Sequence, residues 1–373
     1  MLEIPRTTQD VSADFLTDAL RAGGVIDTDT QVEAFEHEPI GVGVGIVGQL
    51  ARLQLRYDGE AAGAPDGLVL KMPSAFPENR AVGNFFNFYE REGRFYQEIG
   101  AKLSVRTPRC YWNHRDTEAG TFGLLLEDLT GLTSVDQVAG VGPDRAGQAL
   151  AALARLHGEW WNSPALDSLQ WMPRLDDPIN LSAGEQYRQA WPLFVDRVGH
   201  ALSDHAIALG ERVQQCFEDM LITGTAEAPM TICHGDFRGD NLLFDDDATA
   251  ADQVAVLDWQ ISYRGPAITD VAYFLCQSVD VEVRRVHEAA LVRAWYDAVV
   301  ESRGGRPGDE LDDYRFERAW EHYRRSVLGT TVYPVTAAGS MDPANERGRE
   351  LLVMMAERAF SAAIQLGSEE FLA

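Results

Sequence analysis

The chain has 373 residues, of which 45% are hydrophobic, so it is long enough for two or three compact domains that each bury a core. Its 58 acidic residues outnumber 32 lysines and arginines, and the net charge of −26 excludes a typical nucleic-acid partner, because phosphate backbones attract cationic surfaces. The four cysteines form no C-x-x-C pair and no apolar run has membrane-spanning length, so we expect a cytoplasmic chain without disulfides, a zinc site, a signal peptide or a membrane partner.

The first predicted element is an amphipathic helix over residues 12–20, with Ser12 as its N-cap and a glycine pair as its end. A glycine-rich stretch, residues 40–48, then joins two predicted strands. Its glycines, Gly43 and Gly45 among them, allow backbone N–H groups to approach a nucleotide's phosphates closely. An ordinary hairpin turn has the same composition, so this stretch alone does not decide between the two interpretations.

The next strand, residues 68–72, is apolar except for Lys71. Lys71 is a candidate phosphate-binding residue, although a lysine that merely extends its amine to solvent fits equally well. A helix is predicted to follow, with one face formed by Val82, Phe85, Tyr89, Glu92, Tyr96 and Ile99. Glu92 interrupts this apolar face, and a buried carboxylate needs a cation nearby. We therefore predict an ion pair between Lys71 and Glu92.

An apolar strand at residues 121–126 runs into Glu127, Asp128 and Leu129, where the acids are typical of an ordinary strand end. Beyond it, residues 144–161 form a predicted core helix, and residues 182–222 also show helical periodicity.

The most informative segment is residues 230–260. Apolar runs at 231–233 and 242–244 flank a polar loop, and a third run at 254–257 ends in Asp258. This pattern predicts strand, loop, strand, turn and strand. The turn brings Asp258 back beside the polar loop.

Asp236, Asn241 and Asp258 are therefore expected to converge. Phosphoryl transfer needs a carboxylate that accepts the proton of the attacking hydroxyl, together with oxygen ligands for magnesium. These three residues supply both. His234 and Asp240 are interpreted as a satisfied loop residue and as a solvated or loop-capping carboxylate, respectively.

Asp270 lies at the predicted start of the next helix, where the helix dipole stabilises a carboxylate. Further helices are predicted over 283–300, 311–329 and 346–366, with a break at Tyr333–Pro334. We expect these helices to form the outer wall of an acceptor pocket.

The pattern His-Gly-Asp-x4-Asn at 234–241, followed by Asp258, resembles the catalytic segment of the aminoglycoside phosphotransferase and choline kinase superfamily. The runs 257–260 and 270–275 are similar to its ecdysteroid-kinase-like branch. The resemblance implies the following roles: Asp236 is the catalytic base, Asn241 and Asp258 bind magnesium, and His234 and Asp270 support the loop.

The resemblance also implies ATP as the phosphate donor, with Lys71, Glu92, Gly43 and Gly45 at the nucleotide. The backbone of Glu127–Leu129, rather than its side chains, would meet the adenine. The implied fold is α+β and bilobal, like a protein kinase. Residues 1–128 would form a small lobe with an antiparallel sheet and one helix, and residues 129–373 a larger, mainly helical lobe.

The expected activity is transfer of the ATP γ-phosphate to a hydroxyl of a small molecule. Aminoglycosides, amino alcohols, sugars and steroid-like alcohols remain open as acceptors, because a fold does not fix a substrate. The acidic composition favours a cationic acceptor, whereas the resemblance at Trp259–Gln260 favours a bulky apolar alcohol. A nucleotide-binding module without catalytic activity is the alternative. Oligomeric state cannot be read from the sequence.

Overall fold

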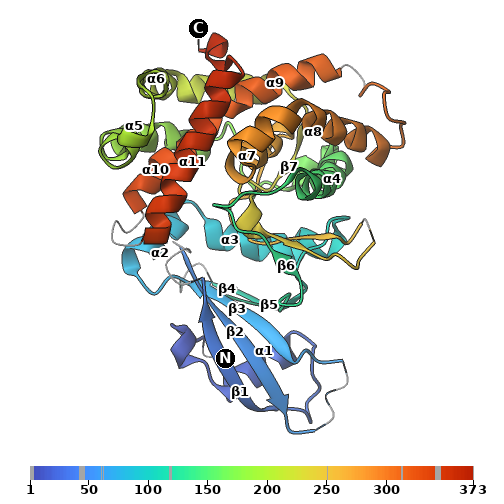
Figure 1. Ribbon diagram of the computed structural model, residues 1–373. Coiled ribbons are helices and arrows are strands. Elements are labelled where there is room, and N and C mark those ends of the chain that lie inside the picture. Colours follow the sequence, from blue (N-terminus) through green and yellow to red (C-terminus); the bar gives the residue numbers. More distant parts are fainter. Residues whose placement is uncertain are drawn as a thin grey trace. The chain divides into compact units, whose positions relative to one another are not determined.

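The computed structural model describes residues 4–41, 47–59, 61, 63–116, 120–249, 251–311, 314–340 and 346–372. It contains two compact units (Figure 1). The small unit comprises Met1–Leu103 and Thr107–Gly131, and the large unit comprises Ser104–Arg106 and Leu132–Ala373. The domain division at residue 128 stays a prediction. Gly43 and Gly45 lie outside the described residues.

The small unit is built on a five-stranded antiparallel sheet with the order β1-β2-β3-β5-β4. The strands are β1 (Val32–Ile40), β2 (Gly48–Tyr57), β3 (Gly67–Pro73), β4 (Cys110–Asp116) and β5 (Thr121–Glu127). Helix α1 (Ala13–Ala22) packs Leu16 and Leu20 against apolar strand residues such as Leu53. The predicted cap is confirmed, because the Ser12 hydroxyl accepts a hydrogen bond of 3.1 Å from the Phe15 N–H.

The single helix predicted over residues 82–99 is divided. Helix α2 (Pro77–Phe85) and helix α3 (Phe88–Arg94) are separated at Asn87, whose φ of 57° is left-handed and therefore interrupts a right-handed helix. A π-helical turn, Phe95–Ile99, follows. The break rotates α2 out of register with the buried face. The expectation that Val82 and Phe85 are buried is therefore wrong, since they are 42% and 64% exposed.

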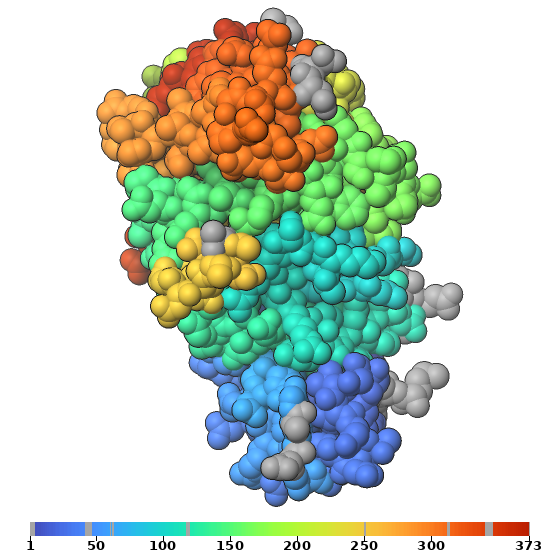
Figure 2. All heavy atoms as spheres, turned by 90° about the vertical axis from the view of Figure 1, so that its right-hand side faces the viewer, coloured from blue at the N-terminus to red at the C-terminus, as the bar shows by residue number. Residues whose placement is uncertain are grey.

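The large unit is mainly helical. Its helices are α4 (Pro143–Trp160), α5 (Pro178–Val198), α6 (Asp204–Glu227), α7 (Ile268–Ser278), α8 (Val281–Ser302), α9 (Phe316–Gly329), α10 (Val332–Ser340) and α11 (Glu346–Gln365). Helix α4 lies beside α8 (Figure 1). The region of α8 and α9, in orange, forms a continuous surface on the face shown in Figure 2.

Helix α10 corrects one expectation. The dipeptide Tyr333–Pro334 was expected to break the helical tail, but it lies in the first turn of α10. Proline is tolerated there, because the first N–H groups of a helix have no partner within the helix.

Two short antiparallel sheets complete the large unit. One contains β6 (Thr133–Ser134), β8 (Leu242–Phe244) and β9 (Val254–Val256), and the other pairs β7 (Met230–Cys233) with β10 (Tyr263–Pro266). The predicted strand, loop, strand, turn and strand of this segment are confirmed. Across the described ranges, no helix is both long and apolar enough to cross a membrane.

Candidate active site

The pairing of β8 with β9 brings Asn241 and Asp258 to one end of a sheet. Leu242, the first residue of β8, pairs with Val256, the last residue of β9. The ladder continues one step further, because the N–H of Leu257 donates to the carbonyl of Asn241 at 2.9 Å. Asn241 therefore enters the sheet at the point where Asp258 has just left it.

Asp258 has an uncommon backbone conformation. Its φ is 61°, and the described residues contain only two other non-glycine residues with positive φ, Asn87 and Asn162. Asn and Asp enter this left-handed region more readily than other non-glycine residues, because their short polar side chains bond locally. Here the amide of Gln260 donates to Asp258 Oδ2 at 3.3 Å. Such backbone strain is frequent at functional sites, where the surroundings maintain it.

The carboxylate of Asp236 is held from several sides. The Asn241 side-chain amide donates to both the carbonyl and Oδ2 of Asp236, each at 2.9 Å. The Tyr273 hydroxyl donates to Oδ1 at 2.7 Å, and Arg238 Nε lies 3.1 Å from the same oxygen. Asp236 remains partly accessible, with 18% of its side chain exposed. A fixed, accessible carboxylate can accept a proton from a bound hydroxyl.

His234 holds the loop at residues 234–241 in place through two contacts of a neutral imidazole ring. Its Nδ1 accepts a hydrogen bond from the Asp236 N–H at 3.2 Å, and its Nε2 lies 2.8 Å from the Leu257 carbonyl. An acceptor at Nδ1 and a carbonyl at Nε2 are compatible only with a ring that carries its proton on Nε2. His234 thus links the loop to the end of β9, as expected of a loop residue.

Trp259 also belongs to this support. Its side chain is fully buried, its ring packs against His234 with centroids 4.6 Å apart, and its indole N–H donates to the Val256 carbonyl at 3.0 Å. The buried side chain of Trp259 therefore supports the loop and does not face solvent.

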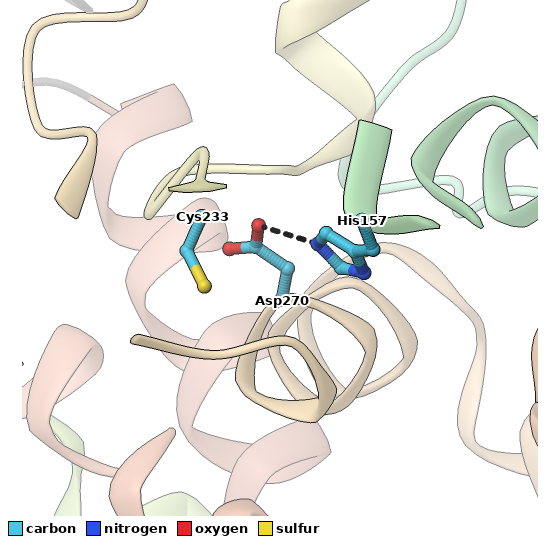
Figure 3. A group of neighbouring side chains, drawn as sticks. All are labelled: His157, Cys233 and Asp270. Atoms are coloured by element: carbon cyan, nitrogen blue, oxygen red, sulfur yellow. Dashed lines mark hydrogen bonds and ion pairs between the residues drawn. The ribbon is translucent and has the colours of Figure 1, made fainter. Parts of the chain in front are cut away.

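Asp270 fixes the backbone of the same loop from α7. Its carboxylate accepts the N–H groups of His234 and Gly235 at 2.7 and 2.9 Å. Figure 3 shows this carboxylate between Cys233 and His157, whose Nε2 lies 3.4 Å from Asp270 Oδ2. Gly235 has φ of 83°, and an added Cβ would lie 2.6 Å from the Ile261 carbonyl oxygen, so the turn requires glycine.

The buried group His157, Cys233 and Asp270 has the ligand types of a metal site, but its ligand atoms are already engaged. His157 Nδ1 accepts the indole N–H of Trp295 at 3.2 Å, which leaves the proton on Nε2, facing Asp270. The Cys233 thiol lies 3.4 Å from the Pro266 carbonyl, and burial raises its pKa well above the ordinary value. We therefore interpret the group as a support for the loop at residues 234–241, the expected catalytic loop.

Magnesium fits Asn241 and Asp258. Because the amide nitrogen of Asn241 is engaged with Asp236, its amide oxygen is the atom left to act as a ligand. An amide oxygen and a carboxylate are hard donors, and magnesium commonly takes only one or two protein carboxylates and retains several waters.

In the small unit, the predicted ion pair between Lys71 and Glu92 is confirmed. Lys71 Nζ lies 2.7 Å from Glu92 Oε1, and the two side chains are 9% and 1% exposed. At the end of β5, Glu127 Oε2 accepts the Arg109 N–H at 3.1 Å, while Leu129 is buried. Both side chains are thus engaged within the unit, and the role of their backbone stays a prediction.

The structure adds three residues to which the sequence assigned no role in the site: Arg238, Tyr273 and Tyr333. Burial alone would lower the pKa of Arg238, but the carboxylates of Asp236 and Asp240 outweigh this effect and raise it above its ordinary value. Asp240, interpreted as solvated or capping, accepts Arg238 at 2.8 Å. Arg238, two positions after Asp236, and Tyr273, within the family-like run 270–275, had a signal in the sequence, whereas Tyr333 had none that pointed to the site.

Comparisons with known proteins concern the family and the fold of the chain. The profile of the Phosphotransferase enzyme family matches residues 78–320. Over 154 residues the chain is 29% identical to acyl-CoA dehydrogenase family member 10 of Mus musculus, covering 38% of this chain and 14% of that protein. Over 228 residues it is 24% identical to an uncharacterized kinase-like protein of Caenorhabditis elegans, covering 55% of each. The chain thus spans 14% and 55% of the lengths of these relatives.

A solved structure of choline kinase from Cryptosporidium parvum Iowa II aligns with 96% of this chain and 96% of its own, with a TM-score of 0.59 and 11% identity. This likeness confirms the bilobal, kinase-like α+β fold. The ecdysteroid-kinase-like branch stays a prediction. Because the family profile covers more than half of the residues, the chain belongs to the phosphotransferase enzyme family.

Proposed function

We propose that this chain transfers the γ-phosphate of ATP, in the presence of magnesium, to a hydroxyl group of a small molecule. Asp236 serves as the base, and Asn241 and Asp258 hold the metal. The observation that carries the proposal is the convergence of a fixed, accessible carboxylate at Asp236 with two hard oxygen ligands at one end of the β8–β9 pair. A site that supplies only structural support would not need this combination.

The acceptor hydroxyl donates its proton to Asp236 as its oxygen attacks the γ-phosphorus. The new oxygen–phosphorus bond forms while the bond to the β-phosphate oxygen breaks, and ADP leaves with that electron pair. A bound magnesium ion would neutralise part of the negative charge of the phosphates. Asn241 orients the base through its bond to Oδ2, and His234 and Asp270 hold the loop that carries it.

For the nucleotide, we propose a contact between Lys71 and the phosphates, with Glu92 orienting the ammonium group. Their buried 2.7 Å pair supports this role, because it presents a cation in a defined position. Gly43 and Gly45 would approach the phosphates, and the backbone of Glu127–Leu129 would meet the adenine. In this proposal residues 1–128 bind nucleotide, and residues 129–373 provide the catalytic loop and the acceptor site.

The acceptor is one of four classes: aminoglycoside, amino alcohol, sugar or steroid-like alcohol. The choline kinase that shares the fold acts on an amino alcohol by its name. The net charge of −26 favours a cationic acceptor such as an amino alcohol or an aminoglycoside. The resemblance at Trp259–Gln260 still favours a bulky apolar alcohol, although the buried Trp259 would not itself contact the acceptor.

The experiment is phosphate transfer from γ-labelled ATP, with magnesium, across a panel of these four acceptor classes. The Asp236→Asn variant should lower the rate by roughly 10²- to 10⁴-fold, the usual contribution of a general base, while the dissociation constant of ATP stays within about threefold. Asp240→Asn is the matched control, since it neutralises a neighbouring carboxylate that also contacts Arg238. Equal losses in the two variants would refute the assignment of the base.

A nucleotide-binding module without catalysis is the second candidate. It predicts binding of ATP with magnesium and no labelled product from any of the four classes. Water as an acceptor provides an additional check, because a competent base and metal site hydrolyse ATP slowly even without an alcohol. Binding without product or hydrolysis would favour this candidate.

A further inference from the structure

The donors around Asp236 are distributed unequally between its two oxygens. An ionised carboxylate offers about four lone-pair positions, two on each oxygen. Oδ1 receives the Tyr273 hydroxyl at 2.7 Å and Arg238 Nε at 3.1 Å. From the described residues, Oδ2 receives only the side-chain amide of Asn241, at 2.9 Å. Among the described contacts, the remaining lone pair therefore belongs to Oδ2.

The side chain of Tyr273 is held in a fixed position by its surroundings. It lies in α7 and is 3% exposed, and its ring lies against that of Tyr333 with centroids 4.1 Å apart. The Tyr333 hydroxyl, from α10, in turn donates to the Gly235 carbonyl at 3.1 Å. Two tyrosines from separate helices thus hold the backbone before the base and the side chain of the base itself.

The Tyr273 hydroxyl acts as a donor throughout. Burial, together with the negative charge of Asp236, raises the pKa of Tyr273 well above its ordinary value, so the phenol keeps its proton at neutral pH. A protonated phenol 2.7 Å from a carboxylate oxygen forms a charge-assisted hydrogen bond, roughly twice as strong as a neutral one.

We infer that Tyr273 is a positioning residue that occupies Oδ1 of Asp236 and thereby makes Oδ2 the oxygen that receives the proton of the acceptor hydroxyl. Without the tyrosine hydroxyl, Oδ1 retains Arg238 and Oδ2 retains Asn241 among the described contacts, and the plane of the carboxylate is held by one donor fewer and can turn about the Cβ–Cγ bond. The acceptor then meets the base in more than one geometry, and fewer of the bound complexes are ready to react. This inference rests on the proposed role of Asp236 as the base.

The test is Tyr273→Phe, which removes one oxygen and retains the ring against Tyr333. A misplaced reacting group reduces rates by about 10²-fold, so we expect kcat to fall by about 10- to 100-fold. The KM values for ATP and acceptor should change by less than about threefold, because the hydroxyl acts on Asp236, to which it donates, and a positioning residue affects the reacting geometry more than ligand binding. ATP hydrolysis is measured in parallel as an acceptor-independent rate.

Tyr296→Phe is the matched control. Tyr296 is 1% exposed, and its hydroxyl donates to the Tyr314 carbonyl at 2.7 Å and accepts the Leu311 N–H at 3.1 Å, so the variant loses a donated hydrogen bond of equal length and one accepted bond in an equally buried place. Its kcat should match that of the parent chain. If Tyr273→Phe and Tyr296→Phe lower kcat equally, or if neither does, the inference is wrong.

A crystal structure of Tyr273→Phe separates this inference from the proposed function. We expect the plane of the Asp236 carboxylate to turn away from its orientation in the parent chain, or to adopt two orientations. An unchanged single orientation overturns the inference even if the parent chain proves to have no phosphotransferase activity. Conversely, an active parent chain whose Asp236→Asn variant is equally active overturns the proposed base and leaves the rotation of the carboxylate to be judged from the crystal structure.

Discussion

The pair formed by Lys71 and Glu92 gives the sharpest prediction about stability. Its atoms lie 2.7 Å apart, with the two side chains 9% and 1% exposed, so water screens the interaction little. Replacing either residue by methionine removes one charge and leaves the other buried beside an apolar side chain. Breaking such a pair costs about 3–5 kcal/mol, whereas replacing both partners is often close to neutral. We therefore expect each single variant to lose about 3–5 kcal/mol and the double variant to lose less than either.

Hydrogen exchange of peptides from β3 and α3, followed by mass spectrometry, measures this loss within the small unit. An exposed pair in the same sheet, Arg56 and Glu33, is the control: its atoms lie 2.9 Å apart, but its side chains are 70% and 55% exposed. The same set of two single variants and one double variant at Arg56 and Glu33 should give a coupling energy below about 1 kcal/mol. If the loss in the double variant equals the sum of the two single losses to within about 0.5 kcal/mol, Lys71 and Glu92 are energetically independent and the reasoning fails.

Three further predictions concern the large unit. Gly235→Ala should abolish transfer while the rest of the unit stays folded, as judged by circular dichroism, because its Cβ would lie 2.6 Å from the Ile261 carbonyl oxygen. Asp270→Asn should increase hydrogen exchange in the catalytic loop, since an amide offers one acceptor oxygen to two backbone N–H groups; unchanged exchange would contradict its supporting role. Burial and nearby arginines lower the pKa of His322 from 6.5 to about 4, so the unfolded chain binds a proton that the folded chain excludes. Stability should therefore fall as the pH drops below about 6.5, and denaturant unfolding should show a smaller fall in His322→Gln.

Much of the fold follows from local patterns in the sequence. The cap at Ser12, the strands around the catalytic loop and the partnership of Lys71 with Glu92 all depend on periodicity or on one misplaced charge. Each of these patterns lies within a short segment, so it can be recognised in a single sequence. The individual roles of Asp236 and its neighbours follow from a resemblance.

The errors have equally local causes. Asn87 adopts a left-handed conformation that helical periodicity does not reveal, and the apolar residues before it are therefore exposed. Pro334 was expected to break the helix, although a proline in a first turn is compatible with a helix.

The contacts of Tyr273 and Tyr333 with the catalytic loop join segments 37 and 98 residues apart along the chain. Only tertiary packing determines contacts over such separations.

The backbone at Asp258 limits which substitutions can be interpreted there. An alanine removes the carboxylate and also imposes a left-handed conformation on a residue that resists it, at a cost of about 1–2 kcal/mol. A loss of activity in that variant would combine two effects. Asparagine deletes the charge and tolerates the same φ of 61°, so it isolates the contribution of the charge. The same restriction favours aspartate, asparagine and glycine at this position on backbone grounds alone, independently of any metal.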